Sequence, residues 1–155
     1  MKNQVVLLLS LSLAACAPMP MSSGASVVGT WTGRPRDTAL YEQRQYRLVF
    51  VGSAQSGMFT WQNSGTGKAG GDWSSCVATH TVLGSYTVNG SSLSLTPASG
   101  TVTRTGCSNT ADNAENAAIP SDSLTDYNDS GTFSIAGSSM TFASMFDGTI
   151  TFTRQ

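Results

Sequence analysis

The sequence is poor in charge. Of its 155 residues, 8 are Lys or Arg and 9 are Asp or Glu, so charged residues make up 11% of the chain, against about 25% in ordinary soluble domains. The lack of a basic excess argues against a nucleic-acid-binding protein. The small net charge does not fit a disordered chain. Too little Ala, Glu, Lys and Leu is present for a coiled coil or helical bundle.

Histidine and cysteine are also scarce. The chain has one histidine, His80, and three cysteines. A Ser-His-Asp site would need His80, but no Gly-x-Ser-x-Gly motif occurs. His80 alternates with Ala78 and Val82, which predicts a place on a strand face. Cys76, Cys107 and His80 together supply too few ligands for a structural metal site. We therefore expect no catalytic residues, no metal and no cofactor.

Hydroxyl side chains take the place of the missing charges. The sequence contains 23 Ser and 19 Thr, together 42 of 155 residues. Thr favours strands because its branched side chain fits a pleated surface. The composition therefore predicts one small all-β domain.

The N-terminus has the pattern of an export signal. Lys2 precedes a short apolar run over residues 5–13, which is too short to span a membrane of about 20 residues but fits a signal peptide. The run ends in Leu13-Ala14-Ala15-Cys16, which resembles the bacterial lipobox. That resemblance implies a diacylglycerol on Cys16. The alternative is an ordinary signal peptide with a cysteine at its cleavage site.

This motif sets the expected organisation of the chain. Residues 1–15 are predicted to be a cleaved signal peptide, 16–26 a lipidated cysteine with a flexible tether, and 27–155 a single barrel domain. Acyl chains would hold the protein on the membrane of the cell envelope. The resemblance to lipoproteins implies that Ala17 directs a diderm protein to the outer membrane, on its periplasmic or surface face.

Two cysteines remain in the exported part. Cys76 and Cys107 would lie in an oxidising compartment, where a disulfide is the usual state. Two free thiols are the alternative if their sites lie far apart.

The exported part reads as a series of short strands. Apolar and hydroxyl residues alternate most clearly near the C-terminus, where Ile150 and Phe152 are separated by Thr151. This alternation is typical of half-buried antiparallel strands. Gly, Ser and Asn separate the candidate strands, which are 27–32, 46–51, 57–62, 76–82, 84–88, 92–96, 101–105, 131–135, 139–143 and 148–153.

An internal similarity links two parts of this series. Residues 84–95 align with residues 131–142, and both segments contain Gly-Ser-Ser in the middle. A duplication and a shared turn chemistry both explain this pattern. The intervening segment 108–130 carries five acidic residues and no basic one. It is long for a loop, and we expect it to hold a short helix or a mobile lid.

Two family resemblances concern the domain. Gly29-Thr30-Trp31 opens the first strand and Arg154 closes the last, which resembles lipocalins and other calycin-like proteins. There a basic residue packs on the Trp and closes one end of an up-and-down antiparallel barrel of eight to ten strands. The stretch from Gly84 to Arg154 is also similar to META/HslJ-type domains. Both resemblances imply a small antiparallel barrel, closed here by Gly29, Trp31 and Arg154.

Candidate binding residues fall into two groups. Four of the basic residues, Arg34, Arg36, Arg44 and Arg47, lie within 14 positions. They are expected either to pair with the acidic segment or to bind an anionic ligand. The second group consists of the aromatic residues Tyr46, Phe50, Phe59 and Trp61. These either fill a packed core or line a cup for a small ligand.

The expected function is non-catalytic. A lipid-anchored envelope lipoprotein would bind a small apolar or anionic ligand, or another envelope protein. The alternative is a periplasmic protease or lysozyme inhibitor, and an enzyme is a distant third. The expected partners are the membrane, through the N-terminal lipid, and one such ligand or protein, but no nucleic acid.

Overall fold

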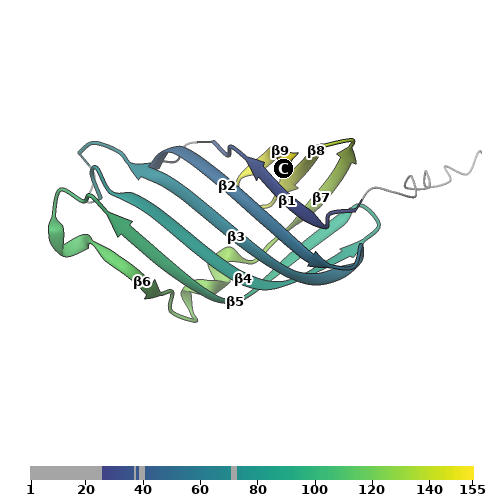
Figure 1. Cartoon of the computed structure of the whole chain (residues 1–155), viewed down its shortest axis with the longest axis horizontal. Helices are drawn as coiled ribbons and strands as arrows, with labels where there is room; N and C mark the ends of the chain where they lie inside the picture. The colour runs from purple at the N-terminus through teal and green to yellow at the C-terminus, as the bar shows by residue number, and fades with distance from the viewer. Residues whose placement is uncertain (1–25, 37, 39–40, 71–72) are drawn as a thin grey trace, which may run out of the picture.

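The domain is built from nine antiparallel strands (Figure 1). A computed structural model describes residues 26–36, 38, 41–70 and 73–155. The strands are β1 Gly29–Gly33, β2 Tyr41–Gly52, β3 Ser56–Gly67, β4 Val77–Asn89, β5 Ser92–Thr105, β6 Ala114–Ala118, β7 Asp129–Ala136, β8 Ser139–Ser144 and β9 Gly148–Arg154. Two short 3-10 helices, η1 Thr110–Asp112 and η2 Ser123–Tyr127, lie between β5 and β7.

Eight of the strands close into a barrel. The hydrogen-bonded order is β1-β2-β3-β4-β5-β7-β8-β9, and β9 pairs back with β1. Strand β6 pairs with β5 outside this ring, where β5 has passed beyond β7. The prediction of a small antiparallel up-and-down barrel is therefore confirmed.

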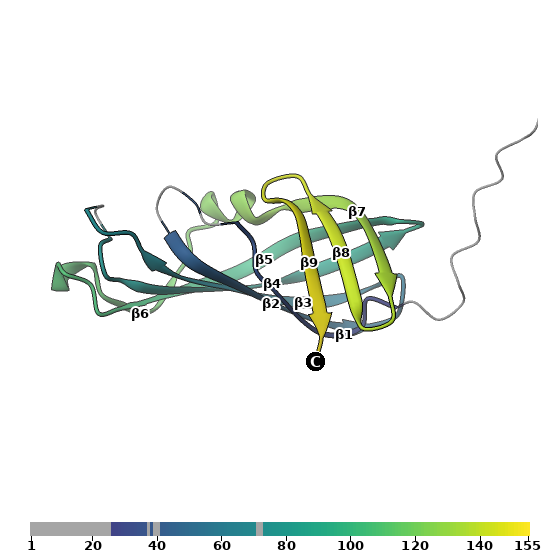
Figure 2. The same cartoon turned by 90° about the horizontal axis from the view of Figure 1, so that it is seen from above.

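The strands differ in length, and this gives the barrel two distinct ends. At the tether end lie Ser26, where the described chain begins, and the turns that follow β2, β4 and β7. At the extended end, β2 to β5 run past the shorter β7, β8 and β9. Figures 1 and 2 show these long strands projecting from the ring, on the side away from the start of β1.

A buried tryptophan closes the tether end. Trp31 is fully buried, and its indole Nε1 donates a hydrogen bond to the Val27 carbonyl at 2.6 Å. The Arg154 guanidinium lies over the Trp31 ring, 4.4 Å from its centre, and donates to the Ser26 carbonyl. A cation over an indole face is attracted by the ring quadrupole. The contact that the lipocalin resemblance implies is thus present.

Alternation along the strands fills the interior and leaves hydroxyl groups outside. On β9, Ile150 and Phe152 are buried while Thr149, Thr151 and Thr153 are exposed. The same period of two is clear on β2 and β8. Aromatic and aliphatic side chains form one core, whose buried members include Trp31, Tyr46, Leu48, Phe50, Phe59, Trp61, Val82, Tyr86, Leu93, Leu95, Phe133, Met140, Phe142, Ile150 and Phe152.

Two predicted pairs of strands are in fact single long strands. The segments 76–82 and 84–88 join in β4, and 92–96 and 101–105 join in β5. The predicted break between these two strands, at position 83, is instead a β-bulge between Leu83 and Gly84. A Cβ at Gly84 would come within 2.1 Å of the Thr96 carbonyl oxygen. Gly84 therefore permits close approach of two strands within a continuous sheet.

The internal similarity coincides with two equivalent hairpins. The β4–β5 turn consists of Gly90 and Ser91, and the β7–β8 turn of Gly137 and Ser138. The two glycines have φ values of 60° and 59°. Two-residue hairpins favour glycine at the first turn position because its φ is positive there. A shared turn geometry accounts for the repeated Gly-Ser-Ser.

The acidic segment is folded onto β5. It contains η1, the short strand β6, which was not predicted, and η2. The Ile119 backbone amide donates to the Gly100 carbonyl at 2.9 Å. Side chains of Ile119 and Leu124 lie so close to Gly100 that a Cβ there would be 2.9 Å from Ile119. Of the two alternatives for this segment, the structure has the short helices.

A disulfide joins Cys76 and Cys107, as predicted. These residues lie just before β4 and just after β5, so the bond fastens the two strands at the extended end. Replacing both cysteines with Ser should lower the free energy of unfolding by about 3–4 kcal/mol, because the 31-residue loop is then open in the unfolded chain.

Urea unfolding followed by tryptophan fluorescence measures this loss. The Cys16→Ser protein, which keeps the disulfide, serves as the parent for the comparison. An unchanged unfolding midpoint would contradict the prediction.

Candidate functional site

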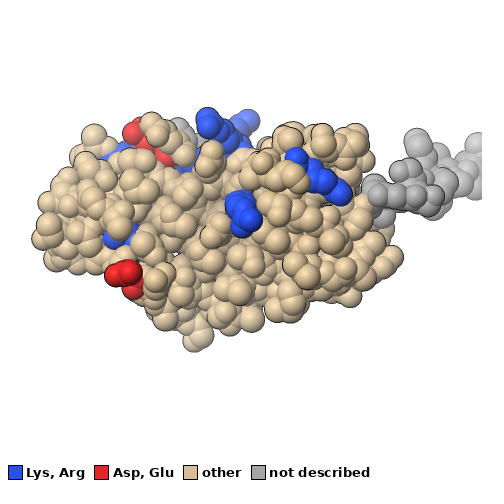
Figure 3. All heavy atoms as spheres, in the orientation of Figure 1, with Lys and Arg blue, Asp and Glu red and all other residues tan. Residues whose placement is uncertain are grey.

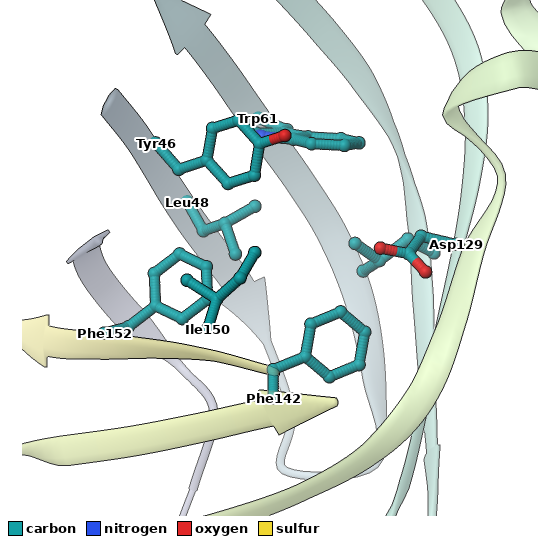
Figure 4. Close-up of a pocket in the computed structure, with 8 residues that line it drawn as sticks. Tyr46, Leu48, Trp61, Asp129, Phe142, Ile150 and Phe152 are labelled. Carbon is teal, nitrogen blue, oxygen red and sulfur yellow. The ribbon is translucent and has the colours of Figure 1, made fainter. Parts of the chain in front are cut away.

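The barrel interior is filled. Its central cavity measures about 10 Å³ and is lined by Tyr46, Leu48, Trp61, Leu95, Asp129, Phe142, Ile150 and Phe152. That is about the space of one water molecule. Figure 4 shows these side chains converging from opposite walls. The Tyr46 and Trp61 rings meet edge to face, with centres 5.0 Å apart. Of the two alternatives for the aromatic group, the structure shows the packed core.

A buried arginine organises the extended end. Arg44 is 7% exposed and forms an ion pair with Asp147 at 3.0 Å. Its guanidinium also donates to the Tyr46 hydroxyl and, at 2.8 Å, to the Arg36 carbonyl. The Tyr46 hydroxyl in turn donates to Asp147. Burial, followed by the Asp147 carboxylate, raises the pKa of Tyr46, so the phenol keeps its proton.

A second carboxylate is buried beside this group. Asp129, at the start of β7, is 6% exposed. It accepts hydrogen bonds from the Ser144 hydroxyl at 2.7 Å and from the Met145 amide at 3.1 Å. Burial raises the pKa of Asp129, and the nearby Asp147 adds to this, while the hydrogen bonds oppose it. Asp129 therefore ties β7 to the β8–β9 turn.

The extended strands carry a further aromatic and polar group on their inner face. His80 Nδ1 is hydrogen-bonded to the Tyr127 hydroxyl. The Arg104 guanidinium lies 4.3 Å from the Trp73 ring centre. Two buried polar atoms, Trp61 Nε1 and Tyr41 Oη, have no hydrogen-bond partner among the described residues. The cavity that Trp61 lines measures about 10 Å³, which leaves no room for an organic ligand there.

The larger hollows lie on the outside of the barrel. One of about 440 Å³ is lined by Thr32, Gln45, Tyr46, Arg47, Gln62, Ser64, Thr79 and Gln155. A second, of about 510 Å³, is lined by Thr32, Gly33, Arg34, Gln45, Thr149, Thr151 and Thr153. Because they share Thr32 and Gln45, we describe them together as the outer furrow.

The outer furrow has one sign of charge. It crosses β9, β1, β2, β3 and β4, where the short β1 presents only small outward side chains between longer ones. Its lining contains two guanidinium groups, Arg34 and Arg47, with hydroxyl and amide groups and no carboxylate. Figure 3 shows how few charged groups this side of the molecule carries.

The structure separates the predicted binding residues. Tyr46, Phe50, Phe59 and Trp61 point into the core, and Arg44 is buried at the extended end, where it donates to the Tyr46 hydroxyl. Arg34, Arg36 and Arg47 are exposed. Pairing of the arginines with the acidic segment is not what the structure shows: among the described residues, the ion pair is between Arg44 and Asp147, which lies in the β8–β9 turn. Cys16 lies outside the described residues.

The chain matches no known family model. A search of curated proteins likewise found no similar sequence.

Several residues of the extended end escaped the sequence reasoning. Asp129, Asp147 and Tyr127 are far from Arg44 and His80 in the chain, and only ring closure brings them together. An acidic residue at a strand terminus, as at Asp129, is a weak signal by itself. For Met145 and Phe146, which are exposed, the available signal was two large apolar residues between predicted strands, shortly before Gly148.

Two further observations concern the described residues. No group of three or more His, Cys, Asp or Glu side chains within them is placed to hold a metal ion. The helices found in this part of the chain do not reach the length and apolar character needed to cross a membrane.

His80 should titrate below the usual histidine value. Burial, followed by the charges of Arg104 and Arg44, lowers the pKa of His80 from 6.5. Because the unfolded chain then binds the proton more strongly, the free energy of unfolding should fall as the pH drops below about 6.5. The fall should end once the pH passes below the lowered pKa, where both states are protonated.

The measurement is simple because the chain has a single histidine. Its imidazole NMR signals give the pKa directly, and urea unfolding at several pH values gives the slope. The His80→Gln protein should lack this part of the pH dependence. A His80 midpoint at or above 6.5 would contradict the prediction.

Proposed function

We propose that this protein is a lipid-anchored lipoprotein of the cell envelope with a non-catalytic binding role, and that it binds an anionic envelope component in the outer furrow. The interior offers about 10 Å³, too little for any organic ligand. Binding therefore belongs to the outside of the barrel.

The observation that carries the choice of ligand is the lining of the outer furrow. Arg34 and Arg47 face a polar surface without a carboxylate to neutralise them. Among the described residues neither forms an ion pair. Guanidinium groups bind carboxylate and phosphate in a bidentate manner. The surrounding Thr, Ser and Gln side chains can bond to the hydroxyl groups of a glycan, so an acidic envelope polysaccharide fits this surface best.

Anchoring rests on the lipobox-like Leu13-Ala14-Ala15-Cys16. Ser26, at the tether end of the barrel, comes ten positions after Cys16. An extended chain of that length reaches at most about 35 Å. The domain would therefore stay close to the membrane surface, where envelope polymers are concentrated.

The anchor has a direct test. Replacing Cys16 with Ser removes the thiol that would carry the lipid, so the protein should move from the membrane fraction to the soluble fraction. Acyl chains hold a protein through about 0.8 kcal/mol for each buried methylene. Fractionation followed by intact-mass measurement reports both location and lipid. A Cys16→Ser protein that stays with the membrane would contradict lipid anchoring.

The furrow is tested with polygalacturonate, a glycan with carboxylates, and with neutral dextran. The delipidated protein should bind polygalacturonate more tightly than dextran. This binding should be tighter at low salt than at high salt, since salt screens the attraction between exposed charges. Arg34→Gln combined with Arg47→Gln should lower the affinity by about tenfold, equivalent to roughly 1.4 kcal/mol.

Lys68→Gln provides the control, because it removes a positive charge outside the furrow lining. Each single Arg variant is compared with it. An equal loss of affinity from Lys68→Gln, or equal binding of dextran, would contradict specific recognition in the furrow.

A second candidate function is inhibition of a periplasmic protease or lysozyme. The observation in its favour is the projecting extended end (Figure 2), where the Cys76–Cys107 bond fastens β4 to β5. A rigid projection loses little conformational freedom on entering an enzyme cleft.

A further inference from the structure

The β8–β9 turn exposes two large apolar residues. Met145, Phe146 and Asp147 connect Ser144 to Gly148, which are paired across the hairpin. Met145 is 71% and Phe146 60% exposed. Gly148, the first residue of β9, has φ 71°, in the left-handed region that favours glycine. The turn therefore holds two apolar side chains out into solvent at the extended end. We refer to Met145 and Phe146 together as the tip.

Hydrogen bonds to Ser144 and Asp129 fix the backbone of this turn. The amides of Phe146 and Asp147 both donate to the Ser144 hydroxyl oxygen at 3.1 Å. The Met145 amide donates to Asp129, and the Ser144 hydroxyl donates to the same carboxylate. All three amides of the turn thus have fixed partners, and Asp129 and Ser144 are buried.

A buried charge holds the turn from its other side. The Asp147 carboxylate accepts hydrogen bonds from Arg44 and from the Tyr46 hydroxyl. Burying charged groups costs stability unless they are paired. Here two buried ionisable residues, Arg44 and Asp129, both bond to one exposed hairpin turn. Such fixing lowers the entropy lost when the turn binds another molecule.

Two exposed arginines lie on a segment that Arg44 joins to the turn. Arg44 Nη1 bonds both Asp147 and the Arg36 carbonyl, which brings the segment 34–36 beside the turn. The Arg34 and Arg36 side chains are exposed and form no ion pair with the described residues. An apolar tip with a basic rim is complementary to an apolar pocket with an acidic rim.

We propose that the tip, Met145 and Phe146, inserts into an apolar pocket with acidic residues at its rim on a partner protein of the envelope. This goes beyond the glycan binding proposed for the outer furrow and uses different side chains, although Arg34 borders both surfaces. Phe146 is the anchor, since large aromatic residues at the centre of an interface carry much of the binding energy.

The occupant is a different protein rather than a second copy of this chain. A phenyl ring needs an apolar pocket, but the apolar cavity inside the barrel measures about 10 Å³. The larger hollows are lined mainly by hydroxyl, amide and guanidinium groups.

The occupant is also a protein rather than a membrane. The tip lies at the extended end, whereas Ser26, through which the chain runs to Cys16, lies at the tether end. A lipid surface can accommodate apolar side chains in many orientations, so binding to lipid does not require a fixed turn. A shaped pocket does gain from one.

Photo-crosslinking in the native host tests the proposal with the full chain. The photoreactive residue benzoylphenylalanine is placed at Phe146 and, in a matched control, at Met58. Met58 is 56% exposed on the outer face of β3, near the tether end. Position 146 should give one protein adduct whose cross-linked residues are apolar with Asp or Glu beside them, and position 58 should not give it.

Affinity measurements with the purified partner complete the test. Phe146→Ser should weaken binding about 30-fold, and Met58→Ser should change it less than twofold. Ser144→Ala, which frees two turn amides without touching the tip, should weaken binding while urea unfolding shows the barrel intact. Polygalacturonate binding should be unchanged in Phe146→Ser. The tip proposal and the furrow proposal can therefore fail independently of each other.

Three outcomes would overturn the proposal. These are adducts of position 146 with lipid or with another copy of the chain, the absence of any adduct at that position, and equal losses of affinity from Phe146→Ser and Met58→Ser.

Discussion

Closure of the ring by β1, which pairs with both β2 and β9, is the constraint on which the rest of the structure depends. Closure fixes which face of every strand is inside, and the inside is then filled by aromatic side chains. A filled interior moves binding to the outer wall and to the ends. The stack of Arg154 on Trp31 seals one of these ends. The furrow on the wall and the tip at the other end are what remains.

Much of the fold could be predicted because strand alternation is a local signal. Ile150 and Phe152 against Thr149, Thr151 and Thr153 identify both the strand and its buried face. Local signals fail before Gly84, where the predicted break between two strands is a β-bulge within one continuous strand. They also fail for β6, whose sequence AENAA has no alternation and whose residues are half-buried or exposed.

The candidate sites were harder to predict because they depend on contacts between distant residues. Arg44 was recognised as one of an arginine group, but its burial depends on Asp147, 103 residues away. The predicted strand began at Tyr46, so Arg44 lay just outside it. In the structure β2 begins at Tyr41, and Arg44 continues the inward series of Tyr46 and Leu48, whereas Arg47 falls on the opposite face and is exposed.

The distance along the chain between Arg44 and Asp147 has a consequence for the order of folding. Contacts between residues far apart in sequence form slowly, because the intervening chain must be ordered first. The β8–β9 turn takes its final shape only when the first and last strands have met. We therefore expect an incompletely folded chain to lack the fixed tip, so that only a molecule that has finished folding presents it to other proteins.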